Sequence, residues 1–130
     1  MKNILVIEDN EQNLYLVTFL LEQNGFAVVQ ERNGPDGISR ADKMLPDLIL
    51  LDIQLPLMDG YAVARALRKI SKLDNVPIIA VTSYAMVGDK EQALEAGCNG
   101  YIEKPINPST FVAEISRYFK NDSNPDEART

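Results

Sequence analysis

The sequence predicts an α/β protein with a doubly wound, five-stranded parallel sheet flanked by five helices, and three observations support this prediction. Apolar runs of strand length recur five times along the 130 residues. A segment of helical length separates each run from the next, so strands and helices alternate strictly. The runs are continuously apolar, which is typical of parallel strands buried on both faces. Right-handed helical crossovers then place helices on both sides of the sheet.

The expected elements follow one another from the N-terminus. The strands are ILVI (4–7), FAVV (26–29), LILL (48–51), PIIAV (77–81) and GYI (100–102), and the helices cover 11–24, 35–44, 59–72, 87–96 and 108–120. Gly25 stands where a C-terminal helix cap is expected, Pro35 suits a first helical turn, and Asp59 can cap the third helix. Pro46 and Pro77 precede or open strands, where a missing N–H costs least.

Length and composition are those of a single domain, which we expect to span residues 1–120. With 45% hydrophobic residues, the chain can form a core without a disulfide or a structural metal. Residues 121–130 contain almost nothing apolar, so we expect a disordered tail or the beginning of a linker. The single cysteine, Cys98, cannot form an internal disulfide and is consistent with a reducing compartment. We expect a cytoplasmic protein without membrane insertion, because no apolar run is long enough to cross a bilayer and the N-terminus lacks a secretory cleavage region.

Charge and the absence of histidine narrow the possible functions. A formal net charge of -6 disfavours direct binding to nucleic acid, which requires clustered lysine and arginine. Without histidine the chain has no Ser-His-Asp triad, no histidine ligand for zinc and no phosphohistidine of its own. Any chemistry must therefore use carboxylates, hydroxyls, lysine or a metal ion.

Polar residues gather where the expected strands end. In an open parallel sheet, ligands bind outside the carboxyl ends of the strands. The residues expected at this edge are Glu8, Asp9, Asp52, Thr82, Ser83 and Lys104. Each alone could be a helix cap or a solvated loop residue. Their convergence from separate parts of the chain indicates a site.

The three acids of this set predict a divalent cation. Crowded carboxylates repel one another and resist ionisation, which a cation relieves. An all-oxygen ligand set is typical of Mg²⁺, and the absence of nearby histidine or cysteine argues against zinc. The cation would in turn attract a phosphate group.

Four motifs resemble the receiver domains of bacterial two-component response regulators, the CheY-like family. They are IEDN (7–10), LLDIQLPLMDG (50–60), AVTS (80–83) and GYIEKPI (100–106). The resemblance covers residues 2 to about 120. Within the family the chain is most similar to the single-domain DivK type, through DIQLP, AMVGD (85–89) and the segment 97–106. The family fold implies the strand order 2-1-3-4-5.

The resemblance implies a phosphorylation site with Mg²⁺. Asp52 would be the phosphoacceptor. Glu8, Asp9 and Asp52 would hold the ion together with the backbone carbonyl of Gln54, a position where many family members carry methionine. A carboxylate is a competent nucleophile towards phosphorus, and the transfer mainly requires in-line positioning and charge neutralisation.

The resemblance also implies a switch. Lys104, joined to Pro105 by a cis bond, would pair with Asp52 before transfer and with the phosphoryl group afterwards. Thr82 would bond a phosphoryl oxygen, and the ring of Tyr101 would change rotamer with it. The protein would then catalyse only its own Mg²⁺-dependent phosphorylation and dephosphorylation, so we do not expect an enzyme in the usual sense.

The expected partners are proteins. The donor would be a histidine kinase or a histidine phosphotransfer protein. The expected face for a downstream target is formed by the fourth helix, fifth strand and fifth helix, near Tyr84, Met86, Val87 and Tyr101. On the first helix, Leu14, Val17 and Leu21 form a buried stripe, whereas Leu16, Phe19 and Leu20 are apolar on further faces. We interpret Leu16 and Phe19 as candidates for donor docking.

Other functions remain open at this stage. A phosphatase of the haloacid-dehalogenase type would need an acid two residues after its nucleophile, where this chain has Gln54. A flavodoxin-like cofactor carrier would need glycines and hydroxyls after the first strand, where this chain has EDNEQN. Within the family, the alternatives are a receiver domain excised from a hybrid histidine kinase, a phosphorelay intermediate, or an adaptor that is not phosphorylated.

Overall fold

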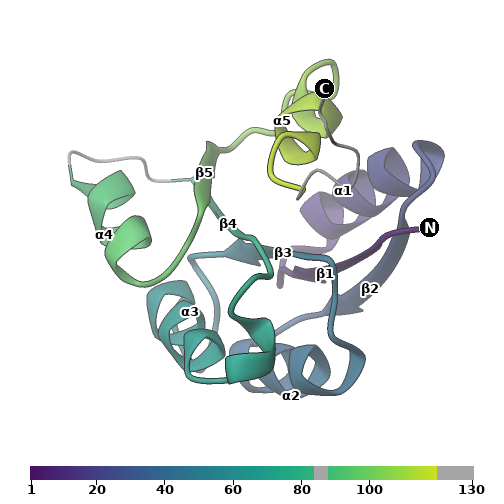
Figure 1. Ribbon diagram of the computed structural model, residues 1–130. Coiled ribbons are helices and arrows are strands. Elements are labelled where there is room, and N and C mark those ends of the chain that lie inside the picture. The colour runs from purple at the N-terminus through teal and green to yellow at the C-terminus, as the bar shows by residue number, and fades with distance from the viewer. Residues whose placement is uncertain (84–87, 120–130) are drawn as a thin grey trace, which may run out of the picture.

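The computed structural model describes residues 1–83 and 88–119, and its five strands form one parallel sheet. The strands are β1 (Asn3–Ile7), β2 (Ala27–Glu31), β3 (Leu48–Asp52), β4 (Ile78–Thr82) and β5 (Gly100–Glu103). Their order is β2-β1-β3-β4-β5, as the resemblance implies. The expected tail and residues Tyr84, Met86 and Val87 lie outside the described residues. Within those limits, the doubly wound α/β prediction is confirmed (Figure 1).

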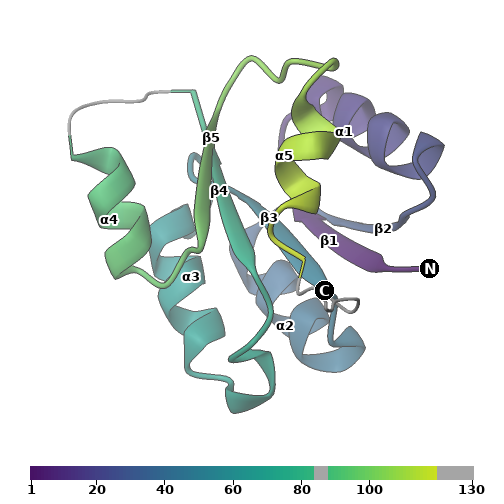
Figure 2. The same cartoon turned by 45° about the horizontal axis from the view of Figure 1, so that its top comes forward.

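Helices cover both faces of the sheet (Figures 1 and 2). They are α1 (Glu11–Gln23), α2 (Gly34–Met44), α3 (Gly60–Arg68), α4 (Asp89–Glu95) and α5 (Phe111–Ser116), with a 3-10 turn η1 (Ser71–Leu73) after α3. Helices α1 and α5 lie on one face, and α2, α3 and α4 pack against the other. No helix in the described part of the chain is both long and apolar enough to cross a membrane.

The core consists of two hydrophobic layers separated by the sheet. Along β1 and β3, neighbouring side chains point alternately to opposite faces. Leu5 and Ile49 join the layer under α2, α3 and α4, whereas Ile4 and Leu50 join the layer under α1 and α5. Since β3 is buried along its whole length, its continuous apolar run contributes side chains to both layers.

Element boundaries differ from the predicted ones where burial is incomplete or a helix is short. Strand β2 begins one residue later than expected and extends through Gln30 to Glu31, because an edge strand that is only partly buried accepts polar residues. The expected third helix ends at Arg68, and the last two helices cover only 89–95 and 111–116. Asp52 and Thr82 are the final residues of β3 and β4, and do not follow those strands as expected.

The predicted helix cap at Asp59 is present, and further residues cap helices without having been predicted to do so. The side chain of Asp59 accepts a hydrogen bond from the Ala62 N–H at 3.0 Å, as its predicted capping role requires. Asn10 and Asn33 cap α1 and α2 in the same manner. Gly25, just beyond α1, has φ of +90°, a conformation that favours glycine.

Candidate functional site

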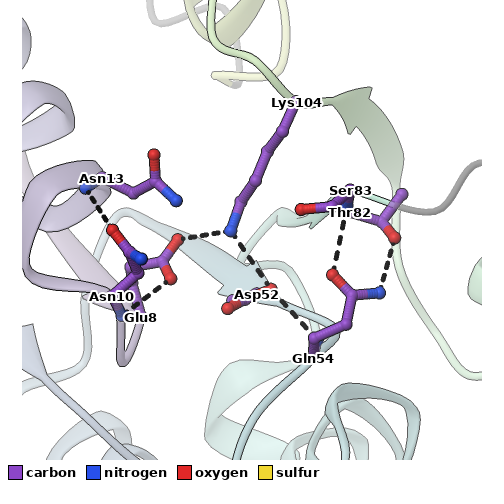
Figure 3. A network of polar contacts seen from close by, with 8 residues as sticks. All are labelled: Glu8, Asn10, Asn13, Asp52, Gln54, Thr82, Ser83 and Lys104. Carbon is purple, nitrogen blue, oxygen red and sulfur yellow. Dashed lines mark hydrogen bonds and ion pairs between the residues drawn. The ribbon is translucent and has the colours of Figure 1, made fainter.

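The parallel strands deliver the expected polar residues to one edge of the sheet. Asp52 ends β3 in register with Val81, and Glu8 directly follows β1. Backbone pairing continues beyond the strands, since the Lys104 N–H donates to the Thr82 carbonyl at 2.8 Å. The positions of Lys104 and Thr82 relative to each other are therefore fixed by the main chain, and Figure 3 shows their side chains around Asp52.

The turn after β1 is organised by its own side chains. One carboxylate oxygen of Glu8, Oε2, accepts a hydrogen bond from the Asn10 N–H at 3.1 Å. Asn10 in turn caps α1 by accepting from the Asn13 N–H at 2.9 Å. The sequence analysis did not identify Asn10, although asparagine directly before an amphipathic helix is a recognisable capping signal. These bonds hold Glu8 inward while Asp9 remains exposed.

The turn after β3 brings α3 against the backbone of Asp52. The Gly60 N–H donates to the Ile53 carbonyl at 2.9 Å. A Cβ atom on Gly60 would lie 2.5 Å from the Ile53 Cα atom and 2.7 Å from the Asp52 carbonyl oxygen, so only glycine fits this approach. The Gln54 N–H donates to Asp52 Oδ1 at 3.0 Å and orients that carboxylate.

A lysine lies between the two buried carboxylates. Lys104 Nζ is 3.0 Å from Glu8 Oε1 and 3.5 Å from Asp52 Oδ1, so its shorter contact is with Glu8 (Figure 3). Glu8 and Asp52 are both buried, at 4% and 3% exposure. The resemblance implied a pair between Lys104 and Asp52. The structure contains this pair and adds a second, shorter one between Lys104 and Glu8.

The electrostatics of the site favour an additional cation. Burial is the main cause that raises the pKa of Asp52 to about 7, followed by a hydrogen bond and a like charge from Glu8; Lys104 and the Gln54 N–H oppose this rise. Each of Glu8, Asp9 and Asp52 offers a carboxylate oxygen within 4.8 Å of the others. Three carboxylates against one ammonium leave an excess of negative charge. This all-oxygen donor set fits Mg²⁺.

The site opens to solvent through a polar cleft of about 400 Å³. It is lined by Glu8, Asp9, Asn10, Glu11, Asn13, Asp52, Gln54, Ser83 and Lys104. A phosphate-sized group can therefore reach Asp52 from outside, whereas the opposite side of the carboxylate borders apolar residues such as Val17 and Phe111.

The side chain of Gln54 makes contacts that sequence reasoning missed. Its Nε2 donates to Thr82 Oγ1 at 2.7 Å, and its Oε1 accepts from the Ser83 N–H at 3.1 Å. The sequence analysis assigned the backbone carbonyl of this residue to the metal site and did not predict these side-chain hydrogen bonds. No local pattern signals such a bridge, because it depends on how closely two separate loops approach.

The expected switch residue Tyr101 lies in β5, in register with Ala80. Its ring packs against the layer under α2, α3 and α4, and its hydroxyl is buried without a hydrogen-bond partner in the part of the chain that the structure describes. A buried hydroxyl without a partner costs free energy in this position of the ring. Lys104 and Pro105 are joined by a cis bond, as the resemblance implied.

Of the apolar residues expected outside the buried stripe of α1, only some are exposed. Leu20 is buried with Leu14, Val17 and Leu21, so its assignment to a further, unburied face was wrong. It follows Val17 by three residues and therefore shares the buried face. Leu16 is half-buried. Phe19 is 49% exposed and stacks on Tyr15, which is 74% exposed, with 6.4 Å between the ring centroids.

Comparisons with known proteins agree with this geometry. Residues 4–116 match the family model of the response regulator receiver domain. The chain is 41% identical over 117 residues to the polar-differentiation response regulator DivK of Brucella anthropi, covering 90% of this chain and 95% of that protein.

The chain is also similar to solved structures of a receiver domain and of a chemotaxis protein. The receiver domain of a sensor histidine kinase from Pseudomonas aeruginosa, which has a magnesium ion coordinated in its active-site cleft, is 34% identical with a TM-score of 0.83, covering 90% of this chain and 96% of that one. The chemotaxis protein CheY4 of Vibrio cholerae is 26% identical with a TM-score of 0.87, covering 92% and 99% of the two chains.

Proposed function

This chain belongs to the response regulator receiver family, and we propose that it is a single-domain response regulator that accepts a phosphoryl group on Asp52 with the aid of Mg²⁺. The observation that carries the proposal is the convergence, at the end of β3, of Asp52 with two further acids and with the ammonium of Lys104. We assign the receiver domain to residues 1–120.

The proposed reaction uses groups that already surround the cleft. An oxygen of Asp52 attacks the phosphorus of a phosphohistidine, a P–O bond forms, and the P–N bond breaks with its electron pair leaving on the imidazole. Lys104 balances charge on the phosphoryl oxygens, and Thr82 donates a hydrogen bond to one of them. Mg²⁺, held by Glu8, Asp9, Asp52 and the backbone carbonyl of Gln54, supplies further charge neutralisation when bound.

The phosphohistidine of the proposed donor lies outside these 130 residues, because they contain no histidine. We propose a histidine kinase or a histidine phosphotransfer protein, docked against the outer face of α1. The exposed, stacked rings of Tyr15 and Phe19 support this location, because aromatic side chains commonly anchor protein interfaces. Leu16, originally expected there, is half-buried and contributes less surface.

The downstream target is proposed to bind the face formed by α4, β5 and α5. Thr82 and Lys104 are linked through the main chain, and β4 pairs with β5 as far as Thr82 and Glu103. Movement of Thr82 towards a phosphoryl group would therefore be felt in β5. Among the described residues, the Tyr101 hydroxyl has no hydrogen-bond partner, which supports a rotamer change there, since an outward ring gains water as a partner.

Intact mass measurement tests the proposal. The protein is incubated with acetyl phosphate and Mg²⁺, in parallel with Asp52→Asn and with Asp74→Asn, an exposed aspartate outside the site. We expect one added phosphoryl group on the wild type and on Asp74→Asn, and none on Asp52→Asn. Amide NMR shifts of residues 88–103 should move in the same samples. Addition that persists in Asp52→Asn, or none on the wild type even with a phosphorylated kinase as donor, would refute the assignment.

A second candidate is a receiver that passes the phosphoryl group onward, within a hybrid kinase or a phosphorelay. The likeness to the receiver domain of a sensor histidine kinase favours it. The two roles differ in the fate of the phosphoryl group: a relay would transfer it to a histidine phosphotransfer protein, whereas a switch would retain it until hydrolysis.

A further inference from the structure

The side chain of Gln54 spans the mouth of the proposed phosphorylation site. It starts from the turn after β3 and reaches the end of β4, where its amide contacts both Thr82 and Ser83 (Figure 3). Its backbone N–H holds Asp52 Oδ1 at the same time. One residue therefore connects the carboxylate with the two positions that lead into the next loop.

The groups held by Gln54 are those that an incoming phosphoryl group needs. The Ser83 residue lines the cleft together with Asp52, and its N–H is a single donor that the Gln54 Oε1 atom occupies at 3.1 Å. A phosphoryl oxygen offers the same kind of acceptor to that donor. Thr82 Oγ1 is held towards Gln54 Nε2 at 2.7 Å, which fixes the rotamer of the hydroxyl.

We propose that the Gln54 amide is a latch that holds Thr82 and Ser83 in their unphosphorylated arrangement and is displaced when a phosphoryl group arrives on Asp52. The inference rests on the proposed function of Asp52. Gln54 acts here as a positioning residue through its side chain, independently of its backbone carbonyl.

The chemistry of the latch is specific to glutamine. The bridge needs one donor and one acceptor at the end of a side chain long enough to cross between the loops. Methionine has similar length but offers neither partner a strong bond, and glutamate lacks the donor and adds charge to an acidic site. Because the latch stabilises only the unphosphorylated state, its removal should favour the phosphorylated one.

Binding of a phosphoryl mimic tests the latch. Beryllium fluoride is titrated at saturating Mg²⁺ into the wild type, Gln54→Met and Gln30→Met, and the backbone amide NMR signal of Lys104 reports occupancy. Gln30 is the matched control, because its Nε2 donates to Thr18 Oγ1 at 2.9 Å on the surface at the β2 edge of the sheet. We expect Gln54→Met to bind the mimic about tenfold more tightly, which corresponds to one net hydrogen bond, and Gln30→Met to match the wild type.

The outcomes separate the latch from the site that it serves. Equal or weaker binding by Gln54→Met, with the wild type binding normally, would overturn the latch and leave the proposed function intact. If none of the three proteins binds the mimic, the function proposed for Asp52 fails, and the latch with it. The wild type gives a test that needs no variant: the side-chain amide signals of Gln54 should shift towards those of a solvated glutamine at saturation, and unmoved signals would also overturn the latch.

Discussion

Asp52 is a carboxylate in a place that favours a neutral group. It is 3% exposed, and it borders apolar side chains on one side and Glu8 on another. Lys104 offsets part of this cost, but Glu8 has the shorter contact with the ammonium. The burial that makes Asp52 costly to ionise also lowers the effective dielectric constant around its carboxylate, so electrostatic interactions with a bound phosphoryl group are stronger there than in bulk solvent.

This conflict predicts how stability depends on pH in the metal-free protein. The folded state raises the pKa of Asp52 from 3.8 to about 7, so between these values the folded protein retains a proton that the unfolded chain has lost. Stability from this group is complete below about pH 4 and is lost as the pH rises through 7, by at most about 1.4 kcal/mol per pH unit. Urea unfolding of the wild type and Asp52→Asn should diverge across this window, with the variant more stable at pH 8.

Stabilisation of the protein by Mg²⁺ gives a second test of the raised pKa of Asp52. Binding competes with the proton on Asp52, so stabilisation by millimolar Mg²⁺ should increase between pH 5 and pH 7 and then level off. Asp52→Asn should lose most of this dependence. Parallel pH profiles for the two proteins, with or without Mg²⁺, would contradict the assigned cause.

At the scale of elements, α1 has one face in the core and another that carries two exposed rings. Leu14 and Leu21 attach it to the sheet, while Tyr15 and Phe19 stack on the solvent side. Packing within the chain does not require the second face. This separation allows a substitution on α1 to affect docking without affecting the core.

Phosphorylation rates with two kinds of donor should separate docking from chemistry. Phe19→Ala is expected to slow transfer from a phosphorylated histidine kinase about tenfold, because truncation of an aromatic anchor commonly costs more than 1 kcal/mol. Transfer from acetyl phosphate, which needs no docking, should be unchanged. Leu45→Ala is the control, since Leu45 is 48% exposed, almost as much as Phe19 at 49%, and lies beyond the end of α2. Equal slowing with both donors would exclude docking as the cause.

The same elements show what sequence could and could not predict. The strands were predictable because a continuous apolar run of this length is typical of a strand buried on both faces. Parallel topology predicted that Asp52 and Lys104 lie at the same edge of the sheet, whereas their pairing was implied by the family resemblance. Boundaries were less accurate: β2 continues to Glu31 because it is an edge strand, a property that depends on tertiary arrangement. The bridge from Gln54 to Thr82 joins residues 28 positions apart, so no local pattern could signal it.

At the scale of the whole molecule, Arg68 joins elements at the opposite end of the sheet from the cleft. From the end of α3, its guanidinium donates to the carbonyls of Leu73, Val76 and Gly97 and to the side chain of Asn99, at 2.7 to 2.9 Å. These groups belong to η1, the approach to β4 and the connection from α4 to β5. One side chain thus fixes the amino ends of β4 and β5, the strands whose other ends carry Thr82 and Lys104.

We therefore expect the planar geometry of the Arg68 guanidinium to contribute more to the stability of the fold than its charge does. Arg68→Lys keeps the charge but cannot serve four acceptors in these directions, so we expect it to lower the free energy of unfolding by about 2 kcal/mol. Arg65→Lys, one turn earlier on the exposed side of α3, should change it by less than about 0.5 kcal/mol. Urea unfolding measures both. Since the network lies far from the cleft, Arg68→Lys should still take up one phosphoryl group from acetyl phosphate when it is folded. Equal stability of the two variants would show that the charge of Arg68, and not its geometry, accounts for its contribution.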